Sequence, residues 1–268
     1  MIEQKNQVEY KGEIVILSDG KAGHYNQSLG ITERIDDVNI KLIEVEFKSK
    51  GYDYLARLTG LIYRFLPFSS ATARTILQKT ITTDCLNSIY ETSPNLVIST
   101  GSSVAAINLL VSEIKDAKAI VCMTPSLMGT DPFDLAIVPK HDNPPKRDNI
   151  LETIGAPNRV TPKLINQEID KWKDLSSVNL KNINHPVVGI MIGGVNSYFD
   201  INRETISNLL DEVDKFLKKH EGEVILTTSR RTPDKIEKLI KERLGDNKRC
   251  RLLILADEWD INPVPMMV

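Results

Sequence analysis

The sequence has few cysteines, and they lie far apart. The three of them, Cys85, Cys122 and Cys250, form no Cys-x-x-Cys pair and no cluster with histidine. This spacing argues against a structural zinc site and against a disulfide framework. We therefore expect three buried, reduced thiols and no bound metal.

The sequence also lacks long apolar runs and a strong charge bias. No uninterrupted apolar stretch in its 268 residues approaches a membrane span, and the polar residues 1–13 do not resemble a signal peptide. With a net charge of −2, the chain has no overall field that would attract nucleic acid. We expect a cytoplasmic protein that does not bind nucleic acid and whose anion sites depend on local side chains.

A third absence is the Gly-x-Gly-x-x-Gly fingerprint of dinucleotide-binding proteins. The chain nevertheless alternates short apolar, β-branched runs with segments of helical spacing, which is typical of α/β proteins with parallel sheets. The predicted strands are residues 13–18, 39–47, 95–99, 119–123, 134–138 and 149–154, followed by 187–192, 223–227 and 251–255. Among the predicted helices are one through Leu29 and Ile35, one over 71–90, one over 164–175 and one over 202–220.

A stretch rich in Asn, Ser and Lys, residues 176–185, separates the two series of strands. We therefore predict an N-terminal α/β domain at residues 1–165, a linker at 166–186 and a C-terminal α/β domain at 187–268. Three strands are few for such a domain, and residues 266–268 resemble the start of an element. We expect the second domain to be incomplete.

The first predicted strand is followed by a loop, residues 19–28, that is dense in functional side chains. Open α/β sheets bind ligands at this end of their strands. Asp19 can accept hydrogen bonds from hydroxyls, Lys21 can meet a phosphate, and His24 is the side chain suited to proton transfer. The alternative is that Asp19 only caps a turn and His24 is an ordinary surface residue. The candidate ligand-binding residues of this loop are Asp19, Gly20, Lys21, Gly23, His24, Asn26 and Gln27.

Other predicted strands of the first domain also end in polar turns, namely Gly101-Ser102 and Lys140-His141-Asp142. Because parallel strands end at one edge of a sheet, we expect these turns on the same side as residues 19–28.

Residues 51–68 form an aromatic and basic amphipathic pattern that ends at Pro67. Such a stripe usually packs into a core, but it can also lie on a membrane interface, here the inner face of the membrane. Both interpretations remain open. The apolar residues of the stripe are Tyr54, Leu55, Leu58, Leu61, Ile62 and Phe65, beside Arg57 and Arg64.

Two turns of the second domain suit phosphate. The first follows residues 187–192, and we expect the helix after it to present its N-terminus to an anion. The second contains two adjacent arginines with hydroxyls before a helix, a common phosphate-binding combination. The alternatives are a plain βα turn and two solvated arginines. The candidate residues are Gly193, Gly194, Asn196, Ser197, Thr228, Ser229, Arg230, Arg231 and Thr232.

Four segments resemble, in order, motifs of the mitochondrial-fission (elongated-mitochondria) family. They are residues 18–30 (SDGKAGHYNQSLG), 134–142 (DLAIVPKHD), 192–194 (IGG) and 227–233 (TTSRRTP), with Asn262-Pro263 where the family has an Asn-Pro pair. Bacterial members are described as glycosyltransferases or as nucleoside-diphosphate-sugar epimerase-like proteins. The resemblance covers about residues 14–263, and the family continues past the Asn-Pro pair with a segment that this chain does not reach.

The resemblance implies a fold like that of GT-B glycosyltransferases, in which two Rossmann-like domains with parallel sheets face a cleft. The first domain would take an envelope glycan or lipid acceptor, and the second a nucleotide-sugar donor, with no cofactor and no metal. Asp19 or His24 would act as base on an acceptor hydroxyl, and the two turns of the second domain would hold the diphosphate. A nucleotide-sugar epimerase and a non-catalytic, membrane-associated adaptor remain alternatives.

Overall fold

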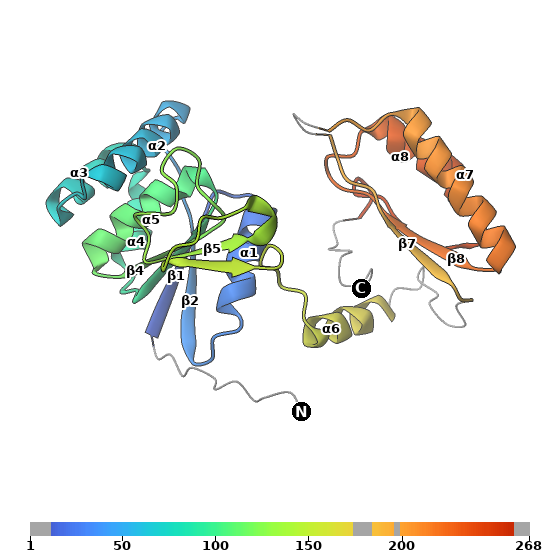
Figure 1. Cartoon of the computed structure of the whole chain (residues 1–268), viewed down its shortest axis with the longest axis horizontal. Coiled ribbons are helices and arrows are strands. Elements are labelled where there is room, and N and C mark those ends of the chain that lie inside the picture. The colour runs from blue at the N-terminus through green and yellow to red at the C-terminus, as the bar shows by residue number, and fades with distance from the viewer. Residues whose placement is uncertain (1–11, 174–183, 196–198, 260–268) are drawn as a thin grey trace. The chain divides into compact units, whose positions relative to one another are not determined.

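A computed structural model describes residues 12–173, 184–195 and 199–259, and the chain divides into two units, Met1–Arg159 and Val160–Val268 (Figure 1). Each unit has its own parallel β-sheet among the described residues. The predicted fold class, α/β with two parallel sheets, is therefore confirmed. The expected linker, residues 166–186, includes much of a helix and also residues 174–183, which lie outside the described residues.

The first unit contains a six-stranded sheet in the order β2-β1-β3-β4-β5-β6. Its elements are β1 (Gly12–Ser18), α1 (Ala22–Thr32), β2 (Val38–Glu44), α2 (Lys50–Phe65), α3 (Ser70–Thr80), α4 (Thr83–Tyr90), β3 (Leu96–Thr100), α5 (Ser102–Lys115), β4 (Lys118–Cys122), β5 (Leu135–Pro139), η1 (Lys140–Asp142) and β6 (Ile150–Thr153). The chain leaves β1 toward β2 and returns to β3 on the other side of β1. The carboxyl ends of β1 and β3 thus form a topological switch point, where open α/β sheets bind ligands.

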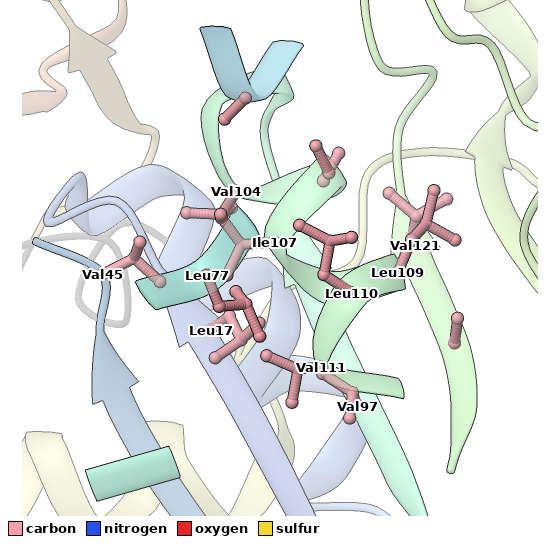
Figure 2. Close-up of a cluster of buried hydrophobic side chains, with 14 of the residues drawn as sticks. Leu17, Val45, Leu77, Val97, Val104, Ile107, Leu109, Leu110, Val111 and Val121 are labelled. Carbon is pink, nitrogen blue, oxygen red and sulfur yellow. The ribbon is translucent and has the colours of Figure 1, made fainter. Parts of the chain in front are cut away.

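Alternating residues of β1 divide the apolar interior of the first unit into two layers. Val15 and Leu17 face a large cluster around α5, shown in Figure 2, whereas Ile14 faces a smaller cluster that includes Ile31 of α1. Residues 103–112 of α5 are all buried, so this helix is enclosed on all sides, as an apolar helix in a core must be. Cys85 and Cys122 are buried as expected, but Cys250 is only half-buried.

Helix α1 begins at Ala22, earlier than the apolar pattern through Leu29 predicts. The reason is that small residues, among them Ser28 and Thr32, form much of its buried face. Ser28 forms a hydrogen bond with Thr100 of β3, with 2.9 Å between the two hydroxyl oxygens. The loop expected at 19–28 is therefore short, and His24 lies on the first turns of a helix.

The single helix expected over residues 71–90 is two helices, α3 and α4. Ile81 leaves the helix to form an isolated antiparallel bridge with Phe47. Thr82 N then donates to the Glu46 carbonyl at 2.8 Å, and its hydroxyl caps α4 by accepting from Cys85 N. A hydroxyl cap favours a helix start at this position.

The second unit has a three-stranded parallel sheet in the order β7-β8-β9. Its elements are α6 (Pro162–Lys173), β7 (Val187–Met191), α7 (Arg203–His220), β8 (Glu223–Thr227), α8 (Asp234–Leu244) and β9 (Cys250–Ile254). Leu210 of α7 and Ile240 of α8 share one apolar cluster with Leu226 of β8, so both helices cover the same face of this sheet.

Candidate functional site

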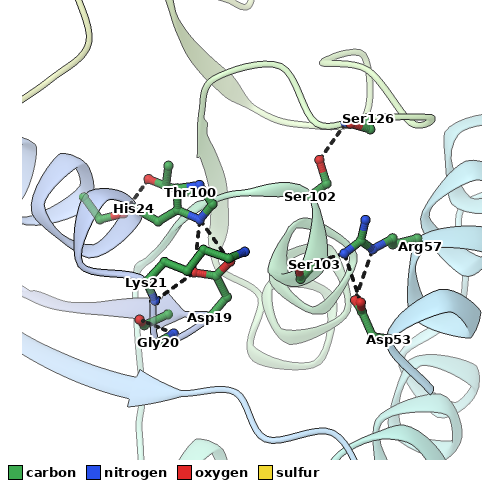
Figure 3. Close-up of polar contacts among 12 residues, drawn as sticks. Asp19, Gly20, Lys21, His24, Asp53, Arg57, Thr100, Ser102, Ser103 and Ser126 are labelled. Atoms are coloured by element: carbon green, nitrogen blue, oxygen red, sulfur yellow. Dashed lines mark hydrogen bonds and ion pairs between the residues drawn. The ribbon is translucent and has the colours of Figure 1, made fainter. Parts of the chain in front are cut away.

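The carboxylate of Asp19 organises the switch point of the first unit (Figure 3). Asp19 follows β1, and Lys21 Nζ donates to it at 2.7 Å, while His24 Nδ1 lies 2.9 Å and 3.0 Å from its two oxygens. Its side chain is only 6% exposed, against 32% for His24. The turn that brings these groups together passes through Gly20 at a φ of +76°, a conformation that favours glycine.

The environment of Asp19 favours its ionised form. Burial alone would raise its pKa, but hydrogen bonds from Lys21 and the neighbouring His24 outweigh burial and hold the pKa below its ordinary value of 3.8. An ionised carboxylate only accepts hydrogen bonds, so Nδ1 of neutral His24 carries the proton and Nε2 the lone pair. Nε2 has no hydrogen-bond partner among the residues that the structure describes. His24 therefore has the arrangement of an oriented base.

Gly101 packs directly against this pair from the end of β3. It has a φ of +103°, and a Cβ built on it would lie 2.5 Å from His24 Nδ1 and 3.4 Å from Asp19 Oδ2. Only glycine fits this space and this conformation. The structure thus brings Gly101 to Asp19 and His24, whereas Ser102 accepts a 2.8 Å hydrogen bond from Ser126 N on the next loop.

A cavity of about 600 Å³ opens beside Asp19 and Lys21. Its other lining residues come from the exit of β2, from the start of α2 and from α5, and are Val45, Phe47, Ser49, Lys50, Asp53, Tyr54 and Ser103. Asp53 accepts from Arg57 at 2.9 Å and 3.1 Å, and Arg57 also donates to Ser103 at 3.1 Å (Figure 3). The sequence shows the Asp53–Arg57 spacing of four residues, but it gives no signal that Ser103 meets them.

Other candidates of the first unit lie outside this group. Asn26 and Gln27 are on α1, and a Cβ on Gly23 would meet nothing within 4 Å. Lys140, His141 and Asp142 form the exposed helix η1 beyond β5, and no contact among the described residues joins them to Asp19 or His24. The cavity beside Asp19 does not include them.

In the second unit, the turn after β7 that contains Gly193 and Gly194 (the glycine turn) contacts the turn after β8 that contains Arg230 and Arg231 (the arginine turn). Thr232 Oγ1 donates to the Gly193 carbonyl at 2.9 Å, and Val195 N donates to the Arg231 carbonyl at 3.2 Å. A Cβ on Gly194 would lie 2.5 Å from the carbonyl carbon of Arg231, so glycine permits this close approach. The carboxyl ends of β7 and β8 thus carry one joined pair of turns.

The side chains of these turns have different surroundings. The hydroxyls of Thr228 and Thr232 are used inside the unit, since Thr228 bonds to buried Glu237 and Thr232 to Gly193. Arg230 and Arg231 are exposed, and Ser229 is half-buried. Asn196, Ser197 and the pair Asn262-Pro263 lie outside the described residues.

The helix expected over residues 202–220, after the glycine turn, is α7. Helix α7 begins only at Arg203, and its first turn is capped by Asn202, which accepts from Thr205 N at 2.8 Å. A capped first turn has fewer donors for an anion. Helix α8 begins immediately after the arginine turn, and its N-cap Pro233 provides no side-chain cap.

Replacing Gly194 by alanine is expected to lower the free energy of unfolding by about 1–3 kcal/mol, because the new methyl group would press on backbone atoms of Arg231. Gly193→Ala is the matched control, since a Cβ there meets no atom within 4 Å. Urea unfolding followed by circular dichroism measures both variants. Equal loss of stability in the two would contradict the close approach of the turns.

Two α/β units with parallel sheets and polar turns at their carboxyl edges define a Rossmann-like protein. The chain belongs to the mitochondrial fission ELM1 family, whose model matches residues 22–268. The family resemblance of the motifs is thereby confirmed. No curated protein matches the sequence.

Solved structures to which this chain is similar include two UDP-GlcNAc 2-epimerases and a UDP complex. The Neisseria meningitidis epimerase bound to UDP-GlcNAc shares 10% identity at a TM-score of 0.46, covering 95% of this chain and 74% of that one. The Methanocaldococcus jannaschii epimerase shares 10% at 0.45, with coverages of 95% and 74%. The S. aureus MnaA–UDP complex shares 11% at 0.44, with coverages of 93% and 70%. These similarities concern the fold alone.

Proposed function

We propose that this protein is a glycosyltransferase that moves a sugar from a nucleotide-sugar donor to a hydroxyl of an envelope glycan or lipid, without a metal or cofactor. The observation that carries the proposal is the Asp19–His24 pair, packed against Gly101 at a topological switch point and beside a cavity of about 600 Å³. Membership of the ELM1 family, with its glycine and arginine turns in the second unit, supports it.

His24 is the proposed base, and Asp19 orients it. Nε2 would take the proton of the acceptor hydroxyl as that oxygen attacks the anomeric carbon of the donor. Ionised Asp19 would stabilise the imidazolium that forms, because the two groups are 2.9 Å apart. Lys21 and Lys50, which line the cavity, would hold polar or anionic groups of the acceptor.

The second unit is the proposed donor side. Arg230 and Arg231 would neutralise the charge of the diphosphate as its bond to the sugar breaks. One guanidinium group can donate two parallel hydrogen bonds to two phosphate oxygens. Ser229 would add a hydroxyl. The open space over Gly193 would let the diphosphate approach the backbone closely.

Binding of nucleoside diphosphates to the full chain tests the donor side. Arg231→Ala is expected to weaken it roughly 10- to 100-fold, the effect of losing a charged hydrogen bond. Arg203→Ala is the control, since Arg203 is exposed on α7 outside the two turns. Isothermal titration with uridine, guanosine and adenosine diphosphates provides the measurement. If none of these binds to the wild-type protein, the proposal fails.

Turnover separates the proposal from its alternatives. A donor with labelled sugar should place its label in an acceptor. Label found in an epimer of the donor would instead indicate an epimerase, and binding without any turnover would indicate an adaptor.

A further inference from the structure

Helix α2 turns its large apolar side chains outward. In Figure 1 it lies at the margin of the first unit, and its exposed residues recur at helical spacing along one face, here called the α2 face. These residues, with their exposed fractions, are Tyr54 72%, Leu55 45%, Leu58 51%, Ile62 46% and Phe65 75%, followed by Leu66 65%. Of the two interpretations of this stripe, packing into the core is therefore wrong for most of its length.

Small residues on the opposite side of α2 explain its orientation. Ala56, Thr59 and Gly60 are buried. A Cβ on Gly60 would lie 3.1 Å from the Ala106 side chain of α5, so the two helices are in close contact there. If α2 were rotated to bury its large side chains, they would have to fit between α2 and α5, where Ala106 already leaves no free space. The α2 face is thus a consequence of the packing.

Basic side chains border the α2 face. Arg57 lies 5.9 Å from the ring centre of Tyr54, and Arg64 lies 5.5 Å from that of Phe65. Each of these arginines also neutralises a neighbouring carboxylate, Asp53 or Asp131. Lys50 begins the helix. Exposed aromatic and aliphatic groups bordered by basic side chains are complementary to an anionic lipid surface.

We propose that the α2 face docks on the surface of an anionic lipid bilayer and that the acceptor is an amphiphile held in that surface. Tyr54 belongs to the face and also lines the cavity beside Asp19. A lipid head group could therefore enter the cavity while its apolar chain stays in the bilayer under α2. The acceptor part of this inference rests on the proposed function, whereas the docking part does not. Among the described residues, no helix is long and apolar enough to cross a membrane.

Flotation of the full-length protein with vesicles tests the docking. Vesicles of phosphatidylcholine alone are compared with vesicles that also contain phosphatidylglycerol. The test variant combines Leu58→Ser, Ile62→Ser and Phe65→Ser. The control combines Leu42→Ser, Leu151→Ser and Ile154→Ser, which are exposed by 49%, 51% and 98% on β2, on β6 and just beyond β6.

The wild type and the control are expected to float with phosphatidylglycerol vesicles, and the test variant to partition at least roughly tenfold less, because three apolar groups no longer enter the lipid. Binding to phosphatidylcholine alone should be weaker, and added salt should reduce binding to the anionic vesicles.

Other occupants of the α2 face give different results, each of which overturns the inference. A wild-type dimer that the test variant converts to a monomer would show that a second copy covers the face. A large fall in melting temperature in the test variant alone would show that another part of the chain covers it. Equal flotation of test variant and control, or none for the wild type, would show that the α2 face does not dock on lipid.

Titration of nucleoside diphosphates on the same samples without lipid separates the two proposals. If diphosphates bind but vesicles do not, only the lipid inference fails. If vesicles bind but diphosphates do not, the proposed function fails and lipid docking stands.

Discussion

Replacing His24 by glutamine is expected to lower sugar transfer by about 100- to 10,000-fold, the usual contribution of a positioned general base. Glutamine can still donate a hydrogen bond to Asp19, but it cannot take a proton from an acceptor hydroxyl. Binding of nucleoside diphosphates should be unchanged, because His24 lies on α1 of the first unit. Initial rates with a labelled donor, together with titration calorimetry, measure both effects.

The variant Asp19→Asn and the double variant Asp19→Asn/His24→Gln test whether the two residues act together. An amide in place of the carboxylate can donate to Nδ1, which would leave the proton on the wrong nitrogen of His24. Because the two residues act as one unit, the double variant should be little worse than either single variant. His220→Gln, at the exposed end of α7, is the control for changing a histidine. A His24→Gln protein within a few-fold of wild type would exclude His24 as the base.

Gly101→Ala is expected to damage the same pair without altering either of its members. The new methyl group would lie 2.5 Å from His24 Nδ1, and alanine would have to adopt a φ of +103°. A residue held in such a conformation costs about 1–3 kcal/mol. We expect a loss of stability of that size and a fall in turnover close to that of His24→Gln, because the imidazole is pushed away from Asp19.

Turnover of Gly101→Ala should be measured at a temperature where unfolding curves show that the protein is folded. Gly155→Ala is the control, since a Cβ at Gly155 meets nothing within 4 Å. Stable Gly101→Ala protein with normal turnover would mean that the position of His24 does not matter for the reaction.

The sequence predicts the sheets better than it predicts which turns meet. Apolar runs and the polar turns after them locate Asp19 and Gly101 at strand ends, because buried parallel strands have that pattern. Strand order decides that β1 lies beside β3 and therefore that Gly101 meets His24. Strand order depends on long-range pairing, and no local pattern near either residue records it.

Two further differences between the expectations from the sequence and the structure have one physical cause. The start of α1 and the orientation of α2 both depend on faces built from small residues, such as Ser28 and Gly60. Apolar periodicity detects large side chains, so it places α1 too late and assigns the large face of α2 to the core. Close packing against a neighbour, which small residues permit, is visible only in three dimensions.

The contact between the two turns of the second unit bears on the thermodynamics of binding. The bonds from Thr232 to Gly193 and from Val195 to Arg231 hold both backbones in place without a ligand. A diphosphate that binds there would immobilise only side chains, so the entropy lost from the backbone should be small. Affinity would then come mainly from charge, and it should decline steadily as ionic strength rises.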